Sequence, residues 1–193
     1  MRERPIIFSG PMVLAILDER KSMTRRVVKP QPEWAKGGVA FIGRRVATYD
    51  ALCPYGQPGD LLYVKETYRH ICNLWQGEGP AVAGVKYRAD DSARNCGSWP
   101  TLKAAPKERW WNTGKQPWQP AIFMPRWASR LTLENRANRI ERVQDITEED
   151  ARAEGFECRE HFIRYWDSLN KKRGHGFDEN DYVWAISFER VTP

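Results

Sequence analysis

The sequence has no long hydrophobic run. No segment approaches the roughly 20 apolar residues that a membrane-spanning helix needs. The first residues are charged, and the apolar run that follows them, residues 6–8, is too short for a signal peptide. The sequence therefore predicts a cytoplasmic protein with no membrane association.

Metal-ligand and nucleophile motifs are also scarce. The chain has four cysteines, but no two of them form a Cys-x-x-Cys pair, and its three histidines have no recognisable ligand spacing. There is no Gly-x-Ser-x-Gly elbow, no phosphate-binding Gly-x-x-x-x-Gly-Lys loop and no dinucleotide fingerprint. We therefore expect free thiols, as in a reducing compartment, with no metal site and no cofactor.

The chain is rich in positively charged residues and in tryptophan. It carries 31 Lys and Arg against 25 Asp and Glu, a net charge of +6. A basic excess favours polyanions such as nucleic acids, although many basic proteins bind none. The 9 Trp residues are many for 193 residues. They either fill a small core, as expected for most of them, or form a stacking surface for bases.

Short predicted strands dominate the chain. We expect strands at residues 5–8, 61–64, 85–88, 122–125 with 128–134, 139–144 and 182–190, and a loop running into a strand at 21–28. Helices are expected at 10–20, at 147–155 with Thr147 as cap and Gly155 as stop, and at 160–172 with residues 162, 163, 165, 166 and 169 inside. Residues 90–119 show no period and predict a long, irregular, aromatic-rich insertion loop. The pattern indicates a single α+β domain over residues 1–193, a small curved sheet or barrel with about three flanking helices.

Lys21 and Thr24 lie where the first helix gives way to a strand, among Arg20, Arg25 and Arg26. A threonine hydroxyl is a poor nucleophile unless a base removes its proton. A lysine can be that base when burial or nearby positive charge lowers its pKa, and the arginines would act in that direction. The alternative is a solvated basic turn after a helix.

Three further places could contribute to a site. Glu154 stands just before the expected helix stop, where a carboxylate opposes the helix dipole by about 0.3 to 1 kcal/mol, which favours the protonated form and suits a proton donor. The alternative is an exposed side chain at a frayed helix end. Glu66 is either a second site carboxylate or the ion-pair partner of Lys65. Arg126 beside Trp127 could hold a phosphate by charge and a base by stacking, or be a surface arginine next to a buried indole.

These residues together resemble the ASCH family, whose domains have a PUA-like fold related to RNA-binding modules. The family marker is a Lys-x-x-Thr-x-Arg stretch after the first helix, here KSMTRR at residues 21–26. One branch, the bacterial N(4)-acetylcytidine amidohydrolase, has its glutamate in a Thr-Glu-x-x-Ala-x-x-Glu stretch, which TEEDARAE at residues 147–154 matches. The resemblance implies a PUA-like barrel, with Thr24 as nucleophile, Lys21 as its base, Glu154 as proton donor and Arg26 shaping the pocket.

The whole chain is also similar to larger ASCH-like proteins that bacteriophages and prophages often carry. The stretches CPYGQPGD at 53–60, MPRWASR at 124–130 and WDSLN at 166–170 carry this resemblance. The chain departs from the small amidohydrolase in two ways. The aromatic insertion has no counterpart there, and Glu19 stands where a glycine usually precedes the marker lysine by two residues.

We therefore expect an amidohydrolase-like domain that acts on an acylated or otherwise modified cytosine, as a nucleoside or within a nucleic acid. The alternatives are a non-catalytic PUA-like reader and a ribonuclease. The expected partner is RNA, a nucleoside or a modified DNA base. The residues expected to bind it are Arg25, Arg26, Glu66, Arg126 and Trp127.

Overall fold

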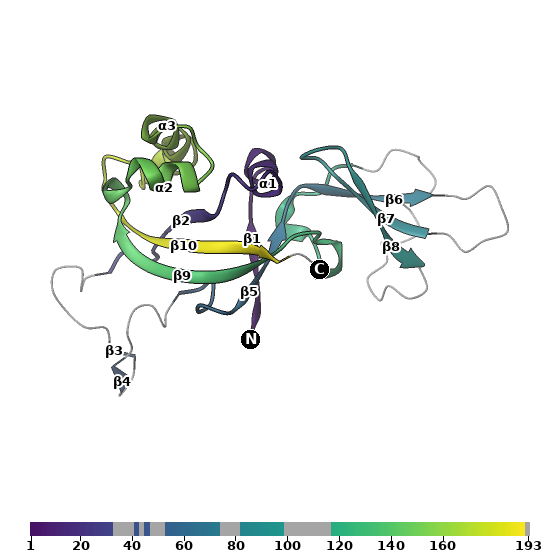
Figure 1. Ribbon diagram of the computed structural model, residues 1–193, viewed down its shortest axis with the longest axis horizontal. Helices are drawn as coiled ribbons and strands as arrows, with labels where there is room; N and C mark the ends of the chain where they lie inside the picture. Colours follow the sequence, from purple (N-terminus) through teal and green to yellow (C-terminus); the bar gives the residue numbers. More distant parts are fainter. Residues whose placement is uncertain (33–40, 43–44, 47–52, 74–81, 99–116, 192–193) are drawn as a thin grey trace. The chain divides into compact units, whose positions relative to one another are not determined.

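A computed structural model of the protein describes residues 1–32, 41–42, 45–46, 53–73, 82–98 and 117–191 (Figure 1). The chain divides into two compact units. The first comprises Met1–Arg4, Ala15–Leu62 and Leu131–Pro193, and the second comprises Pro5–Leu14 and Tyr63–Arg130. The division runs through β1 (Glu3–Ile7), α1 (Gly10–Leu17) and β5 (Leu61–Lys65). The expected single domain over residues 1–193 stays a prediction.

The largest sheet has five strands in the order β1-β5-β9-β10-β2. Its long antiparallel pair is β9 (Thr132–Arg142) with β10 (Tyr182–Val191), interrupted by a register shift between Ser187 and Phe188. The short strand β2 (Met23–Val27) runs antiparallel to β10. Among the described strands this is an open sheet with β1 and β2 at its edges, so the closed barrel that the resemblance implies is not formed there.

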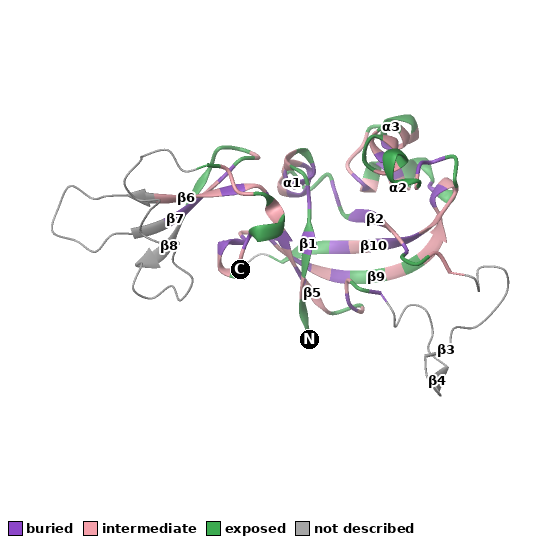
Figure 2. Cartoon of the chain, turned by 180° about the vertical axis from the view of Figure 1, so that it is seen from behind, coloured by how far each residue is buried: buried purple, intermediate pink, exposed green. Residues whose placement is uncertain are grey.

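Two helices of the first unit, α2 (Glu148–Ala153) and α3 (Arg159–Asn170), lie over one face of β2, β9 and β10 (Figure 1). Burial of apolar side chains between helices and sheet holds this layer together. Figure 2 shows the buried stretches of β2 and β10 beneath them. The core cluster consists of Val143, Ile146, Ala151, Phe162, Trp166, Phe177 and Val183.

The ends of α2 follow local sequence rules. The Thr147 side chain accepts a hydrogen bond from the Asp150 backbone N–H, and acidic residues fill the first turn. Gly155 has a φ of 88°, the left-handed conformation that ends helices and favours glycine. Both predictions, Thr147 as the N-cap and Gly155 as the stop, are confirmed, and Glu154 is the C-cap residue.

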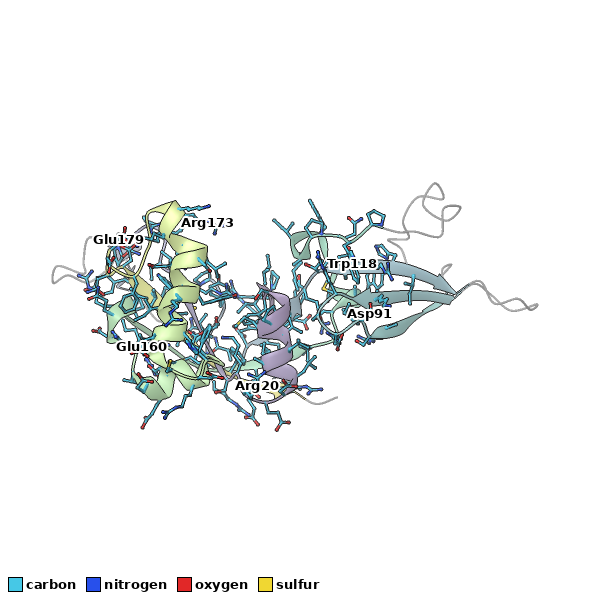
Figure 3. The ribbon with its side chains drawn as sticks, turned by 90° about the horizontal axis from the view of Figure 1, so that it is seen from above. Arg20, Asp91, Trp118, Glu160, Arg173 and Glu179 are labelled. Atoms are coloured by element: carbon cyan, nitrogen blue, oxygen red, sulfur yellow. The ribbon has the colours of Figure 1, made fainter. Side chains whose placement is uncertain are left out.

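The predicted helix at residues 160–172 is confirmed as α3, followed by the 3-10 turn η8 (Lys171–Arg173). Glu160 lies at its first turn and Arg173 beyond its end, so the charges suit the helix dipole (Figure 3). Phe162 and Trp166 are buried, but Leu169, which we expected inside, is 47% exposed. The buried stripe is narrower than the sequence pattern suggests, because only one face of α3 meets the sheet.

A three-stranded antiparallel sheet in the second unit consists of β6 (Tyr68–Asn73), β7 (Val82–Tyr87) and β8 (Ala93–Ser98). The expectation of an irregular loop from residue 90 is therefore wrong over residues 93–98. The error has a physical reason: β8 pairs with β7 through its backbone, while its sequence lacks apolar alternation. The rest of the predicted insertion, residues 99–116, lies outside the described residues.

Of the strand pair expected around Pro125, the first strand, at 122–125, is wrong. Two 3-10 turns, η5 (Ala121–Phe123) and η6 (Arg126–Ala128), stand there, each preceded by a proline. Proline has no backbone N–H for a strand ladder, and its fixed φ suits the start of a turn. The strand expected at 128–134 begins only at Thr132, and it continues through most of the strand expected at 139–144 as the single strand β9. This strand ends at Arg142, before the 3-10 turn η7 (Val143–Asp145).

The other predicted elements are confirmed at β1, α1, β2, β5, β7 and β10. A short pair, β3 (Phe41–Ile42) with β4 (Arg45–Val46), completes the described strands. Cys53 and Cys158 are free thiols. Within the described residues, no helix has the length and apolar character to cross a membrane.

Candidate functional site

The turn after α1 positions Lys21. Glu19 has a φ of 59°, in the left-handed region that favours glycine. This is the position at which the resemblance leads one to expect glycine. The Lys21 backbone N–H then donates to the Ala15 carbonyl at 3.0 Å. Lys21 next forms an antiparallel backbone bridge with Glu154, at the end of α2.

Lys21 and Glu154 form a buried ion pair. The Lys21 Nζ donates to Glu154 Oε2 and to the Glu154 backbone oxygen, each at 2.8 Å, and each residue is 4% exposed. Burial, which desolvates the ammonium, lowers the pKa of Lys21; the Glu154 carboxylate opposes this, and Arg26 and Arg25 lower the pKa further. A lowered pKa increases the fraction of neutral amine near neutral pH, and the neutral amine is the form of lysine that can accept a proton. The arginines thus act in the expected direction, but burial is the larger cause.

Arg25 is an interior residue. Its side chain is 0% exposed, and its Nη2 lies 2.5 Å from both Glu141 Oε1 and Asp150 Oδ2. Its Nη1 lies 3.4 Å from Glu154 Oε1. The sequence led us to expect a contact with substrate or nucleic acid here. In the structure this guanidinium instead forms ion pairs with three carboxylates. Because it is buried, a phosphate group in solution cannot reach it.

A half-exposed arginine closes the network on its outer side. Arg139 lies 2.6 Å from Glu141 Oε2 and 2.5 Å from Asp150 Oδ2. The resulting charge cluster balances three cations against three carboxylates: Lys21, Arg25, Arg139, Glu141, Asp150 and Glu154. Sequence reasoning missed three of the six. The available signal was the Arg-x-Glu alternation in β9, which places residues 139 and 141 on one face.

Thr24 is buried in β2, but its side chain lies on the other face of that strand. Met23 Sδ accepts from Arg25 Nη1 at 3.5 Å, so these two side chains share the face that carries the charge cluster. Side chains alternate along a strand, which places Thr24 and Arg26 on the opposite face. Thr24 is in register with Ile186 of β10.

The structure therefore brings two of the three predicted catalytic groups into direct contact. Lys21 and Glu154 are hydrogen-bonded, whereas strand alternation turns the Thr24 side chain away from the face on which Arg25 meets Glu154. Arg26, expected to shape the pocket, shares the face of Thr24. Within the described residues, no cluster of three His, Cys, Asp or Glu side chains is suited to a metal ion.

Glu66 belongs to the second unit and is the partner of an arginine. It is 1% exposed, and Arg130 binds it with both arms of its guanidinium, at 2.8 Å and 3.0 Å. Lys65, the partner considered from sequence, donates instead to the Ile122 carbonyl. Burial raises the pKa of Glu66, while the hydrogen bonds from Arg130 oppose that rise. The sequence analysis considered Glu66 as a site carboxylate or as the partner of Lys65, and neither hypothesis included Arg130.

Arg126 and Trp127 also belong to the second unit. The Arg126 guanidinium is exposed and lies 5.3 Å from the centroid of the Tyr63 ring. Trp127 is half-buried and packs against the core of this unit, with its ring 5.7 Å from that of His70. The arginine thus stacks on Tyr63, a residue the sequence did not single out. Phe123, three residues before Arg126 in the sequence, is 68% exposed.

Comparison with known proteins gives two similar structures. In fold, the chain is similar to an ASCH domain. That domain, from Lactobacillus crispatus JV V101, has a TM-score of 0.44 and 11% identity, over 98% of this chain and 79% of its own. A DUF984-family protein from Enterococcus faecalis V583 has a TM-score of 0.41 and 9% identity, over 99% of this chain and 80% of its own. No protein-family model matches the sequence, and no curated protein matches it significantly.

Proposed function

We propose that the protein is an amidohydrolase-like enzyme that removes an acyl group from the exocyclic nitrogen of a modified cytosine, in a nucleoside or a nucleic acid. The observation that supports this most directly is the buried Lys21–Glu154 pair, with 2.8 Å between Nζ and Oε2. A base and an acid in direct contact and shielded from water can exchange a proton without solvent reorganisation. The pair is formed by the two motifs that carry the resemblance to the acetylcytidine amidohydrolase.

The reaction needs a nucleophile at the acyl carbon. In the scheme that the resemblance implies, the Lys21 ammonium first transfers a proton to the Glu154 carboxylate, which leaves a neutral amine and a carboxylic acid. Lys21 then accepts the Thr24 proton, the hydroxyl oxygen bonds to the acyl carbon, and the C–N bond breaks as Glu154 protonates the leaving amine. Water then hydrolyses the Thr24 ester and releases the acid. Because Thr24 lies on the other strand face, a water molecule activated by Lys21 is the competing nucleophile.

The deciding experiment is turnover of N(4)-acetylcytidine by wild-type protein and by Lys21→Met, Glu154→Gln and Thr24→Ala. Ser22→Ala, a change at an exposed neighbour in the same segment, is the matched control. We expect deacetylation by wild type and by the control, and a loss of at least about 100-fold in Lys21→Met and Glu154→Gln. Loss in Thr24→Ala assigns the threonine as nucleophile, and near-wild-type turnover assigns water. A folded wild-type protein with no turnover contradicts the enzyme proposal.

A second candidate function is a non-catalytic nucleic-acid reader, which one observation favours. The exposed Arg126 stacks on Tyr63, and the exposed Phe123 precedes Arg126 by three residues, in a chain of net charge +6. Exposed aromatic and guanidinium groups bind bases by stacking and phosphates by charge. Binding to single-stranded RNA should weaken with salt and in Phe123→Ala and Arg126→Ala, but not in Arg173→Ala, a matched loss of one exposed charge. Equal weakening by both arginine changes would leave only non-specific charge attraction.

A further inference from the structure

The Glu154 carboxylate is held between two cations of one chain segment. Lys21 Nζ lies 2.8 Å from Oε2, and Arg25 Nη1 lies 3.4 Å from Oε1. The two oxygens therefore face different partners, and rotation of the carboxylate would weaken both contacts. The proposed proton path uses the Oε2 side, because that oxygen meets Lys21.

Arg25 is itself fixed from three sides. Glu141 of β9 and Asp150 of α2 each lie 2.5 Å from its Nη2, and the Phe162 ring of α3 has its centroid 5.9 Å from the guanidinium carbon. The side chain is 0% exposed. A guanidinium has several N–H donors in one rigid plane. Once Glu141 and Asp150 fix the Nη2 nitrogen of Arg25, the direction of its Nη1 nitrogen is fixed as well. That direction is toward Glu154.

We infer that Arg25 is a positioning residue for the Lys21–Glu154 pair: its guanidinium, fixed by Glu141 and Asp150, holds the Glu154 carboxylate in the orientation that meets the Lys21 ammonium. Arg25 acts through Glu154 and Lys21 and does not contact substrate. The inference rests on the proposed function for its effect on turnover. Its effect on the charge state of Lys21 does not depend on any reaction.

Two consequences follow from removing Arg25. A proton donor displaced by about 1 Å can lose up to about 100-fold in rate while substrate binding persists. In addition, Arg25 is one of the charges that lower the pKa of Lys21, so its loss should raise that pKa. The charged groups around the pair are Arg26 on β2, Arg139 and Glu141 on β9, and Asp150 on α2.

The test compares Arg25→Gln, which removes the positive charge, with Arg25→Lys, which keeps the charge but lacks the planar, two-armed guanidinium. On N(4)-acetylcytidine we expect kcat to fall about 10- to 100-fold in both, with KM within about threefold of wild type. NMR titration of the Lys21 side chain should show a higher midpoint in Arg25→Gln and a midpoint nearer wild type in Arg25→Lys. Val183→Ala, a core truncation beneath the same helices, controls for loss of stability and should change neither kcat nor the titration.

The outcomes separate this inference from the proposed function. If wild type turns over the substrate and both Arg25 variants keep its kcat and its Lys21 titration, the inference is overturned and the function stands. If wild type shows no turnover, the function fails, and the Lys21 midpoints decide. A rise in Arg25→Gln that Arg25→Lys restores only in part supports the inference, because Arg25→Lys keeps the charge and loses only the guanidinium geometry. An unchanged midpoint in Arg25→Gln, or full restoration in Arg25→Lys, overturns it. If Arg25→Gln does not fold, Arg25→Lys decides, and a kcat near wild type overturns the inference.

Discussion

The Lys21 ammonium reaches Glu154 twice, at the side-chain carboxylate and at the backbone oxygen, each at 2.8 Å. The two residues are 133 positions apart in the chain, and each is 4% exposed. One side chain therefore joins the start of β2 to the end of α2. The pair is a structural tie as well as the proposed proton path, so stability and activity respond to the same substitutions.

Breaking this ion pair should destabilise the first unit. Lys21→Met leaves the Glu154 carboxylate buried with only the longer contact to Arg25, and Glu154→Gln leaves the ammonium without its countercharge. Each should lower the free energy of unfolding by about 3 to 5 kcal/mol, because an uncompensated buried charge is costly. The double variant should lose clearly less than the sum, as measured by urea unfolding followed through tryptophan fluorescence. Losses that add to within about 0.5 kcal/mol would show that the two residues are uncoupled.

Stability should depend on pH through Lys21. Burial lowers the pKa of the folded-state ammonium below its ordinary value of 10.5. Between that lowered pKa and 10.5 the unfolded chain binds more protons than the folded one, so stability increases with pH in this window. We expect the free energy of unfolding of wild type, relative to Lys21→Met, to rise as pH is raised through the window and to be flat below it. A difference that stays constant up to pH 10.5 contradicts the assignment.

Both the backbone conformation at position 155 and the atoms around it require glycine there. Its φ is 88°, and a Cβ there would lie 3.1 Å from Ala15 Cβ and 3.3 Å from Lys21 Cβ. Gly155→Ala should therefore cost about 1 to 3 kcal/mol and also lower turnover, by displacing Lys21. Gly174→Ala is the matched control, since Gly174 has a φ of 76° and no atom within 4 Å of the added Cβ. Equal losses of unfolding free energy in the two variants would show that crowding at Gly155 is unimportant.

In the second unit, Asp90 should stabilise the fold in a pH-dependent way. Desolvation opposes its ionisation, but hydrogen bonds from Arg130 and Ser92 outweigh this and lower the pKa of Asp90 to about 2. A carboxyl with a lowered folded-state pKa contributes fully above its ordinary value of 3.8, and the contribution is lost as pH falls through about 2. The side chain is 28% exposed, so Asp90→Asn should cost only about 1 kcal/mol at pH 7.

The measurement is the unfolding free energy of wild type and Asp90→Asn between neutral and acidic pH. Their difference should shrink as pH approaches about 2. Asp91→Asn is the control, because Asp91 is 73% exposed and forms a surface ion pair with Lys86. It should change stability by less than about 0.5 kcal/mol. A difference for Asp90→Asn that persists unchanged at the acidic end would contradict the assigned pKa.

The sequence by itself determined the features that depend on near neighbours. Thr147 as cap and Gly155 as stop could be predicted because the atoms involved lie within a turn of one another. The motif residues Lys21 and Glu154 were found as candidates in the same way, from short stretches and a resemblance. Lys21 needed no knowledge of the fold to be recognised as a basic residue between a helix and a strand.

Only the tertiary structure decided which of those side chains are in contact. Pairing of β2 with β10 places Arg25 toward the helices and Thr24 away from them, and a shift of one residue in that register would exchange the two. Likewise, Arg130 reaches Glu66 across 64 positions of the chain. Burial and charge partners arise from long-range packing, and a short stretch of sequence does not encode which distant side chain will meet it.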